Sequence, residues 1–209
     1  MEHSTAKRSS RERICEAALS AFAKHGFDGV GVTKIASDAG VSQPTIHYHF
    51  KTKRALWEAA MMQLGVSLER TRSVQNELYG FLPPLEKLKA TCALLIEDAA
   101  TRPVLGQIIL SEGQAGGKRL EWLLRHVLSD TYYEFQETIE ACIRGGLIKP
   151  YQPAQILMLL TGAAVTQFNV SPLVAAVFGD NPHARQNVDA FKAMYLDIIF
   201  TGLIVNKEE

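Results

Sequence analysis

The sequence predicts an all-α protein of about nine helices, and two observations lead to this fold class. Apolar residues recur at helical spacing along almost the whole chain, and no stretch alternates apolar and polar residues as a half-buried strand does. Glycine, proline and capping residues mark the breaks between the helical stretches. With 209 residues, the chain can bury one large core or two small ones.

Three short helices are predicted at the N-terminus, each with a capping residue before it. The first start is the best defined, because the stretch SSRE places Glu12 three residues after Ser9 in the pattern of a capping box. The third helix has a proline in its first turn, where a missing N–H does no harm. The first helix is expected to have Ser9 as its N-cap and Gly26 just after its end. The second is expected to follow Thr33 as N-cap and to stop at Gly40. The third is expected to start at Ser42 and to run to about His49.

Longer helices are predicted beyond this point. A fourth helix begins after Thr52 as N-cap and covers KTKRALWEAAMMQLGVSLERTRSV. The motifs LPP, TRP, AGG, RGGLIKPYQP and GDNP separate the later helices. We place the domain boundary after the third helix, with a head at 1–54 and a larger domain at 55–209. The later helices are expected at 84–99, 102–112, 118–144, 153–178 and 183–206.

The composition disfavours several classes of protein. A content of 47% hydrophobic and 21% charged residues is ordinary for a globular chain. No apolar run is long enough to span a bilayer, and MEHSTAKRSSRER lacks the apolar part of a secretory signal. We therefore expect a cytoplasmic protein with no membrane partner. The widely spaced Cys15, Cys92 and Cys142 favour buried free thiols over a disulfide framework or a zinc ribbon.

Charge is distributed unevenly along the chain. The net charge is zero, but residues 1–54 hold nine Lys and Arg against five Asp and Glu, which gives +4 and leaves −4 for the rest. The excess is modest. It suggests that the N-terminal head has an anionic partner.

The stretch AGVSQPTIHYHFKTK joins the second and third helices by a tight turn and indicates a helix-turn-helix. Gly40 allows a positive φ in the turn. Ile35, Val41 and Ile46 are expected to form a small core between the two helices. The outward face of the third helix then carries Gln43, Pro44, Thr45, His47 and Tyr48.

That face has the chemistry needed to read DNA in the major groove. Gln43 can pair bidentately with adenine, and Thr45 can form a hydrogen bond or contact a thymine methyl group. Thr33 and Lys53 lie at the starts of the flanking helices, where side chains and backbone N–H groups can bind phosphates.

The stretch VTKIASDAGVSQPTIHYHFKTKRALW resembles the DNA-binding signature of TetR-family transcriptional regulators, and the likeness covers residues 10–58. The resemblance implies a three-helix DNA-binding head, a long connecting helix, and a helical domain for ligand binding and dimerisation. The chain departs from the family pattern at His47, where tyrosine is usual. The predicted DNA-binding residues are Thr33, Lys34, Ser42, Gln43, Pro44, Thr45, His47, Tyr48, His49 and Lys53.

Two other interpretations of the HYH stretch are less well supported. A metal site is disfavoured because His47 and His49 point in different directions on a helix, and no third ligand follows at helical spacing. An active site is disfavoured because the chain has no GxSxG, P-loop or GxGxxG motif. We expect no enzyme activity, no bound metal and no cofactor.

The last two predicted helices are the expected dimer surface, because both carry apolar stripes. The resemblance implies that they pair with their copies as a four-helix bundle. The alternative, a core within one chain, stays open for part of this surface. The predicted interface residues are Ile156, Leu160, Ala164, Phe191, Met194, Tyr195, Ile198, Ile199 and Gly202.

The middle of the chain, about 57–168, is expected to hold a pocket for a small molecule. Its candidate residues are aromatic, methionine or amide side chains, which favours a moderately apolar effector. Each of them could equally belong to the core. The candidates are Trp57, Met61, Tyr79, Phe81, Gln107, Trp122, Tyr132, Phe135 and Gln167.

Together these features predict a homodimeric, ligand-responsive transcriptional regulator. We expect a repressor that binds a palindromic operator in double-stranded DNA and is released by a small molecule. Two alternatives stay open: a helix-turn-helix DNA binder without an effector, and a helical enzyme that carries a DNA-binding head.

Overall fold

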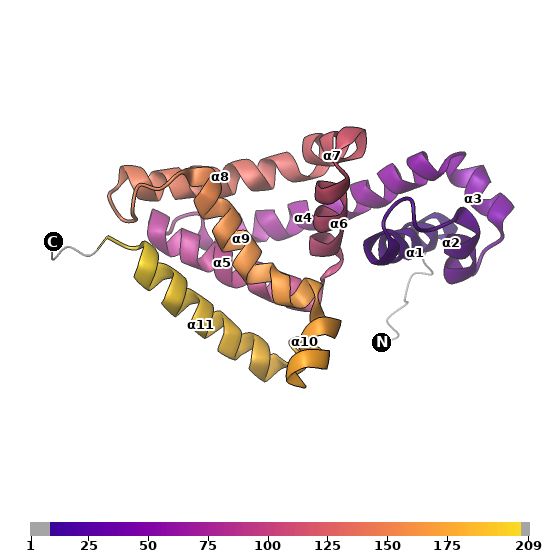
Figure 1. Cartoon of the computed structure of the whole chain (residues 1–209). Helices are drawn as coiled ribbons and strands as arrows, with labels where there is room; N and C mark the ends of the chain where they lie inside the picture. The colour runs from indigo at the N-terminus through magenta and orange to yellow at the C-terminus, as the bar shows by residue number, and fades with distance from the viewer. Residues whose placement is uncertain (1–8, 206–209) are drawn as a thin grey trace, which may run out of the picture. The chain divides into compact units, whose positions relative to one another are not determined.

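The computed structural model describes residues 9–205, and the predicted all-α class is confirmed. The only β-type pairing in this part of the chain is a single bridge between Ile148 and Ile204. A π-helical turn, Leu124–Leu128, lies between two of the helices. The helices are α1 (Ser10–His25), α2 (Val32–Ala39), α3 (Gln43–Phe50), α4 (Lys53–Tyr79), α5 (Pro84–Thr101), α6 (Val104–Ala115), α7 (Gly117–Leu123), α8 (Ser129–Arg144), α9 (Pro153–Asn169), α10 (Ser171–Phe178) and α11 (Arg185–Leu203) (Figure 1).

The helix boundaries of the head follow from local capping. The backbone N–H of Glu12 donates to the hydroxyl of Ser9, and the Ser9 N–H donates to the Glu12 carboxylate, so the predicted capping box of α1 is confirmed. Gly40 ends α2 in the left-handed conformation at φ +63°. Ser42 caps α3 by accepting a hydrogen bond from the backbone N–H of Thr45.

One predicted cap is wrong. The N-cap of α2 is Gly31, and Thr33 lies within the first turn of the helix. Its hydroxyl donates to the side-chain oxygen of Gln43 at 2.9 Å instead of accepting a bond from its own helix. A contact between helices therefore replaces the local one that the sequence suggested.

Two of the predicted long helices are divided in the structure. The stretch predicted at 118–144 is interrupted by the π-helical turn between α7 and α8. The stretch predicted at 153–178 bends by 69° between α9 and α10. Pro172 explains this bend, because a proline has no N–H with which to continue the hydrogen bonds of α9. The predicted end of the last helix, residue 206, lies outside the described residues.

The described residues pack into two compact units. The first contains everything up to Glu69 together with Gln107–Val127, so it joins α1–α3 and the first part of α4 to α7 and most of α6. The second contains Arg70–Gly106 and the chain from Leu128 onward. The sequence alone suggested a single boundary after residue 54. Both α4 and α6 are divided between the two units.

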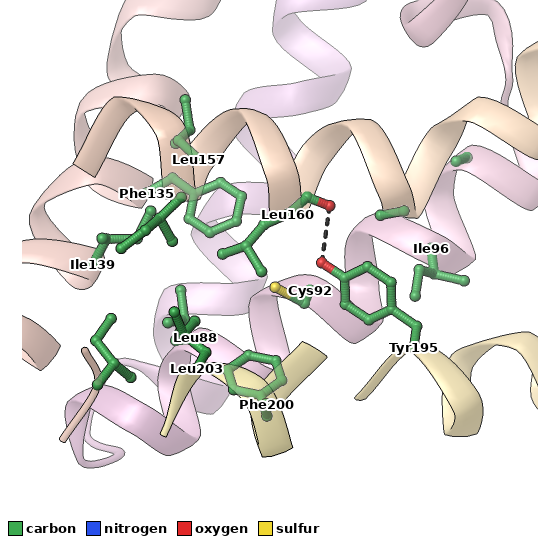
Figure 2. Packing of buried hydrophobic residues seen from close by; sticks show 14 of the residues in the cluster. Leu88, Cys92, Ile96, Phe135, Ile139, Leu157, Leu160, Tyr195, Phe200 and Leu203 are labelled. Carbon is green, nitrogen blue, oxygen red and sulfur yellow. Dashed lines mark hydrogen bonds between the residues drawn. The ribbon is translucent and has the colours of Figure 1, made fainter. Parts of the chain in front are cut away.

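The core of the second unit is formed by α5, α8, α9 and α11. Helix α5 packs on the other three, and α9 also packs on α8, α10 and α11. Figure 2 shows the centre of this core, where the Tyr195 hydroxyl donates a hydrogen bond of 2.8 Å to the carbonyl of Leu160. Burial raises the pKa of Tyr195 and raises that of Cys92 to about 12. All three cysteines are buried and unpaired, as predicted.

Four of the residues predicted at the dimer interface are instead part of this core. Ile156, Leu160, Ala164 and Tyr195 are buried within their own chain. The apolar stripe of each helix was identified correctly, but for these residues it faces the neighbouring helices of the same unit.

No single helix within residues 9–205 has the length and hydropathy needed to cross a membrane. Taken together, α9 and α10, which are bent relative to each other, have the length and composition of a membrane-spanning segment, and this rests on length and composition alone.

A network of charges joins α5 to α11. Arg185 forms paired hydrogen bonds with Asp189 at 2.7 and 2.8 Å, and with Glu97 at 2.8 and 3.2 Å. Lys192 also contacts both carboxylates. The bond from Lys192 is the main cause that lowers the pKa of Glu97, and the bond from Arg185 is the main cause that lowers that of Asp189.

We expect Glu97→Gln to lower the unfolding temperature at pH 7. An acid whose pKa is lower in the folded state stabilises the fold above its unfolded pKa, about 4.3 for Glu, and this contribution is lost as the pH falls further. The difference in unfolding temperature between the variant and the parent should therefore shrink below about pH 4. Thermal melts by circular dichroism from pH 7 to pH 3 test this. The matched control is Glu77→Gln, which removes the same charge from an exposed position of α4. An equal difference at every pH would contradict the role of the network.

Candidate nucleic-acid interface

The helix-turn-helix is built on a small apolar seam between α2 and α3. Ile35 and Ala36 of α2, and Ile46 and Phe50 of α3, are buried, and α2 also packs on α1. The predicted seam is therefore present, with Val41 in the turn half-buried. Because these residues face inward, the opposite side of α3 faces outward.

Most of the residues predicted to bind DNA are exposed. Among them, Tyr48 has 82% of its surface accessible. Thr45, His49 and Lys53 are half-buried and the other predicted residues are exposed. The charge of Lys34 is partly neutralised, because its ammonium lies 2.5 Å from the carboxylate of Asp38. The structure thus leaves seven of the ten predicted residues exposed and brings Thr33, Gln43 and His47 into contact with one another.

Polar side chains on this surface are already bonded to one another. The amide of Gln43 lies between the Thr33 hydroxyl, at 2.9 Å, and Nε2 of His47, at 3.4 Å. The hydroxyls of Ser42 and Thr45 are 2.8 Å apart. Sequence reasoning placed these side chains on one face but did not predict the bonds between them.

Lys53, the predicted phosphate ligand at the start of α4, lies against an aromatic ring. Its ammonium is 4.5 Å from the ring centroid of Phe27, and the guanidinium carbon of Arg119 is 4.4 Å from the same centroid. Both cations gain from the negative potential of the ring face. Phe27 also meets Trp57 edge-on, with ring centroids 6.4 Å apart. One aromatic ring thus links α7 to the start of α4.

Arg119 is held by a buried carboxylate that the sequence did not reveal. Its Nε donates to both oxygens of Glu112 at 3.0 and 3.2 Å, and its NH2 group lies 3.6 Å from Asp28. Glu112 is only 3% exposed. No sequence signal identifies this pair, because the two residues are seven apart and separated by a break between α6 and α7. Their importance follows only from burial.

The predicted effector residues are divided between the two units. Trp57 and Met61 are fully buried in the first unit, where Trp57 packs edge-on against Trp122 with centroids 5.4 Å apart. Gln107 belongs to the same unit, whereas Tyr79, Phe81, Tyr132, Phe135 and Gln167 belong to the second. Phe81 is 78% exposed, so it does not line an enclosed pocket. An open hollow at the α8–α9 turn is lined by none of the candidates; its residues are Glu140, Ile143, Arg144, Pro150, Tyr151, Gln152 and Pro153.

The outer sides of α9 and α11 carry an exposed apolar surface. Met158 and Leu159 of α9, and Met194 and Ile198 of α11, are each more than half exposed. Gly202, also predicted at the interface, is exposed with open space around it, whereas Phe191 and Ile199 are half-buried against the core. Of the residues predicted at the interface, Met194, Ile198 and Gly202 are thus exposed.

We expect Arg119→Met to lower the free energy of unfolding of the first unit by about 3 kcal/mol, because Glu112 would remain buried without its cation. Adding Glu112→Gln should recover part of the loss, since a neutral amide costs less to bury. Both tryptophans lie in this unit, so urea unfolding followed by tryptophan fluorescence reports on it directly. Equal stability of the parent and of Arg119→Met would show that the pair contributes nothing.

Comparisons with known proteins agree on one family. Residues 14–60 match the model for bacterial regulatory proteins of the tetR family. The HTH-type transcriptional regulator RutR of Escherichia coli strain K12 is 26% identical over 179 residues, which cover 85% of this chain and 82% of that protein. The tetracycline repressor protein class D of Escherichia coli is 39% identical over 57 residues, or 27% of this chain and 26% of that one.

The solved structures agree on the fold. AibR, in complex with isovaleryl coenzyme A and operator DNA, matches with a TM-score of 0.72 and 19% identity, over 92% of this chain and 98% of that one. The family match spans most of α1, all of α2 and α3, and the start of α4, which are the elements that build the exposed surface described above. The chain therefore carries a DNA-binding head of the tetR family of bacterial regulatory proteins, with its helix-turn-helix formed by α2 and α3.

Proposed function

We propose that the protein is a homodimeric repressor that acts in the cytoplasm, binds a palindromic operator and is released by a small-molecule effector. The observation that carries the proposal is the polar outer surface of α3, held outward by the buried seam beneath it. The N-terminal residues of such a helix read base edges when it lies in the major groove. Thr33 and Lys53, at the starts of α2 and α4, supply the phosphate contacts that fix its register.

The residues of this surface have distinct roles in the proposal. Gln43 reads an adenine through its amide, and Thr45 contacts a neighbouring base. Lys53 binds a phosphate through its charge, and the backbone N–H groups at the start of α4 assist it. Ser42 and Pro44 shape the first turn of α3, which brings these side chains to the groove.

The exposed apolar surface of α9 and α11 supports a dimer. Met158 and Leu159 of α9, and Met194 and Ile198 of α11, are large apolar side chains that stay exposed in the single chain, and a protein contact would cover them. Gly202 allows close approach of a second helix because its surroundings are open. Two heads on one dimer bind a palindrome far more tightly than one head, because the second contact becomes intramolecular.

The effector is proposed to act through α6 and α7. These helices pack with the head in one unit and hold it through Arg119, whose ring partner Phe27 also contacts Lys53. A ligand that favours another position of α6 would change the presentation of α3 and α4 to DNA. The structural relative AibR was solved with isovaleryl coenzyme A, which supports a small-molecule effector here. The aromatic and methionine candidates favour a moderately apolar one.

We expect Gln43→Ala to weaken binding to the selected operator by about 1–3 kcal/mol and to relax the preference at one base position. Lys53→Ala should weaken binding to all sequences alike and reduce the slope of affinity against salt concentration, because one phosphate contact is lost. The operator comes from selection of bound DNA from a random pool, and fluorescence anisotropy at several salt concentrations gives the affinities. An unchanged base preference in Gln43→Ala would exclude the proposed orientation of α3.

We expect Ile198→Glu to produce a folded monomer. Ile198 is 61% exposed in the single chain, so a charge there is tolerated until a partner would remove it from water. The variant should keep its helical content and bind the palindrome much more weakly than the parent. Light scattering gives the mass and a DNA titration the affinity. Thr201→Glu, at another exposed position of α11, is the control for added charge. A variant that stays dimeric would place the interface elsewhere.

A further inference from the structure

Four groups form a continuous chain of hydrogen bonds along the outer surface of α3. The Thr33 hydroxyl donates to Oε1 of Gln43 at 2.9 Å. Nε2 of Gln43 lies 3.4 Å from Nε2 of His47, and Nδ1 of His47 lies 3.4 Å from the carbonyl oxygen of Lys51. Lys51 ends α3 with a positive φ of 54°, which sets the direction of that carbonyl. The chain thus runs from α2 across α3 to the turn that precedes α4.

The donors and acceptors of this chain are compatible in only one order when the imidazole is neutral. The carbonyl of Lys51 can only accept, so Nδ1 of His47 must carry the proton. Nε2 of His47 is then an acceptor, and it requires the NH2 group of Gln43 to face it. With the opposite orientation of the Gln43 amide, Nε2 of His47 would have to donate, and an unprotonated Nδ1 would face the Lys51 carbonyl. The backbone of Lys51 therefore selects the orientation of the Gln43 amide through His47.

This arrangement leaves the amide of Gln43 ready for a base. Its oxygen has two acceptor sites and its nitrogen two hydrogens, and the chain occupies one of each. One acceptor site and one N–H remain, and these are the two kinds of group that adenine requires, since N6 donates and N7 accepts in the major groove. The order in which they are presented along α3 is the order that His47 imposes.

We propose that His47 is a positioning residue for sequence specificity: it fixes the orientation of the Gln43 amide, and so determines which base pair that amide reads. The inference rests on the proposed function, in which α3 lies in the major groove. It gives a role to the histidine that stands where the family usually has tyrosine. A phenol can also accept, but it has no second ring atom that donates to the Lys51 carbonyl.

The proposal differs in its consequences from a direct phosphate contact by His47. A phosphate contact would contribute equally to every DNA sequence and would appear in the salt dependence of binding. A positioning residue acts only through Gln43. Its removal should alter the base preference at a single position and leave the salt dependence as it was.

A double-mutant cycle on the full-length protein tests the proposal. The four proteins are the parent, Gln43→Ala, His47→Phe and the double variant, and His47→Gln is added to restore an acceptor. His47 is exposed, so these changes are compatible with the fold, and circular dichroism checks it. The DNA is the selected operator and its three single-base variants at the position that Gln43→Ala relaxes. The quantity measured is the ratio of affinities for the preferred base pair and the others.

In the parent this ratio should be on the order of tenfold. His47→Phe should reduce it several-fold, His47→Gln should restore part of it, and neither should change the salt slope. In the Gln43→Ala background, His47→Phe should have no further effect, because the two residues act as a unit.

Three results would overturn the inference. Equal weakening of all operators with a shallower salt slope would make His47 a phosphate ligand. If His47→Phe lowers the ratio of affinities in the Gln43→Ala background as well, then His47 itself reads a base. If Gln43→Ala changes no base preference at all, the groove orientation in the proposed function fails and the inference fails with it; the first two results leave that orientation standing.

Discussion

The apolar seam between α2 and α3 is the constraint on which the DNA-facing surface depends. A helix places successive side chains about 100° apart, so once Ile46 and Phe50 point inward, Tyr48 between them must point outward. Gln43, at the first position of α3, and His47 are also exposed. Gly40 makes the seam possible, because the short turn requires a positive φ that costs other residues strain. The polar surface is therefore a consequence of what is buried beneath it, and changes in the seam would redirect every contact made by α3.

The elements that the sequence predicted well are those set by local rules. The capping box at Ser9, the left-handed Gly40 and the cap at Ser42 depend on residues three or four positions apart, which a single sequence displays directly. Thr33 was assigned wrongly because a residue from another helix, Gln43, binds its hydroxyl. The sequence did not predict the π-helical turn Leu124–Leu128, because no residue type in this stretch distinguishes it from an α-helix.

The candidate sites were harder to predict because packing between distant residues determines them. An apolar stripe shows that a helix buries one face, but it does not show whether the partner is the same chain or another copy. Leu160 and Tyr195 belong to the core for this reason, while Ile198 on the next face of α11 is exposed. The ion pair of Glu112 and Arg119 joins α6 to α7 where one helix ends and the next begins. Its contribution to stability comes from the burial of the carboxylate.

The burial of the cysteines has a practical consequence for attaching spectroscopic labels to this protein. The sequence contains three, Cys15, Cys92 and Cys142, and each is enclosed in a core with burial raising the pKa of its thiol. Thiolate is the form that reacts, so the three native cysteines should not react with thiol reagents while the chain stays folded. A single cysteine introduced on the exposed side of α3 would accept a spectroscopic label without removal of the native ones. In the proposed dimer, the distance between two such labels would measure the separation of the two copies of α3, with and without a candidate ligand.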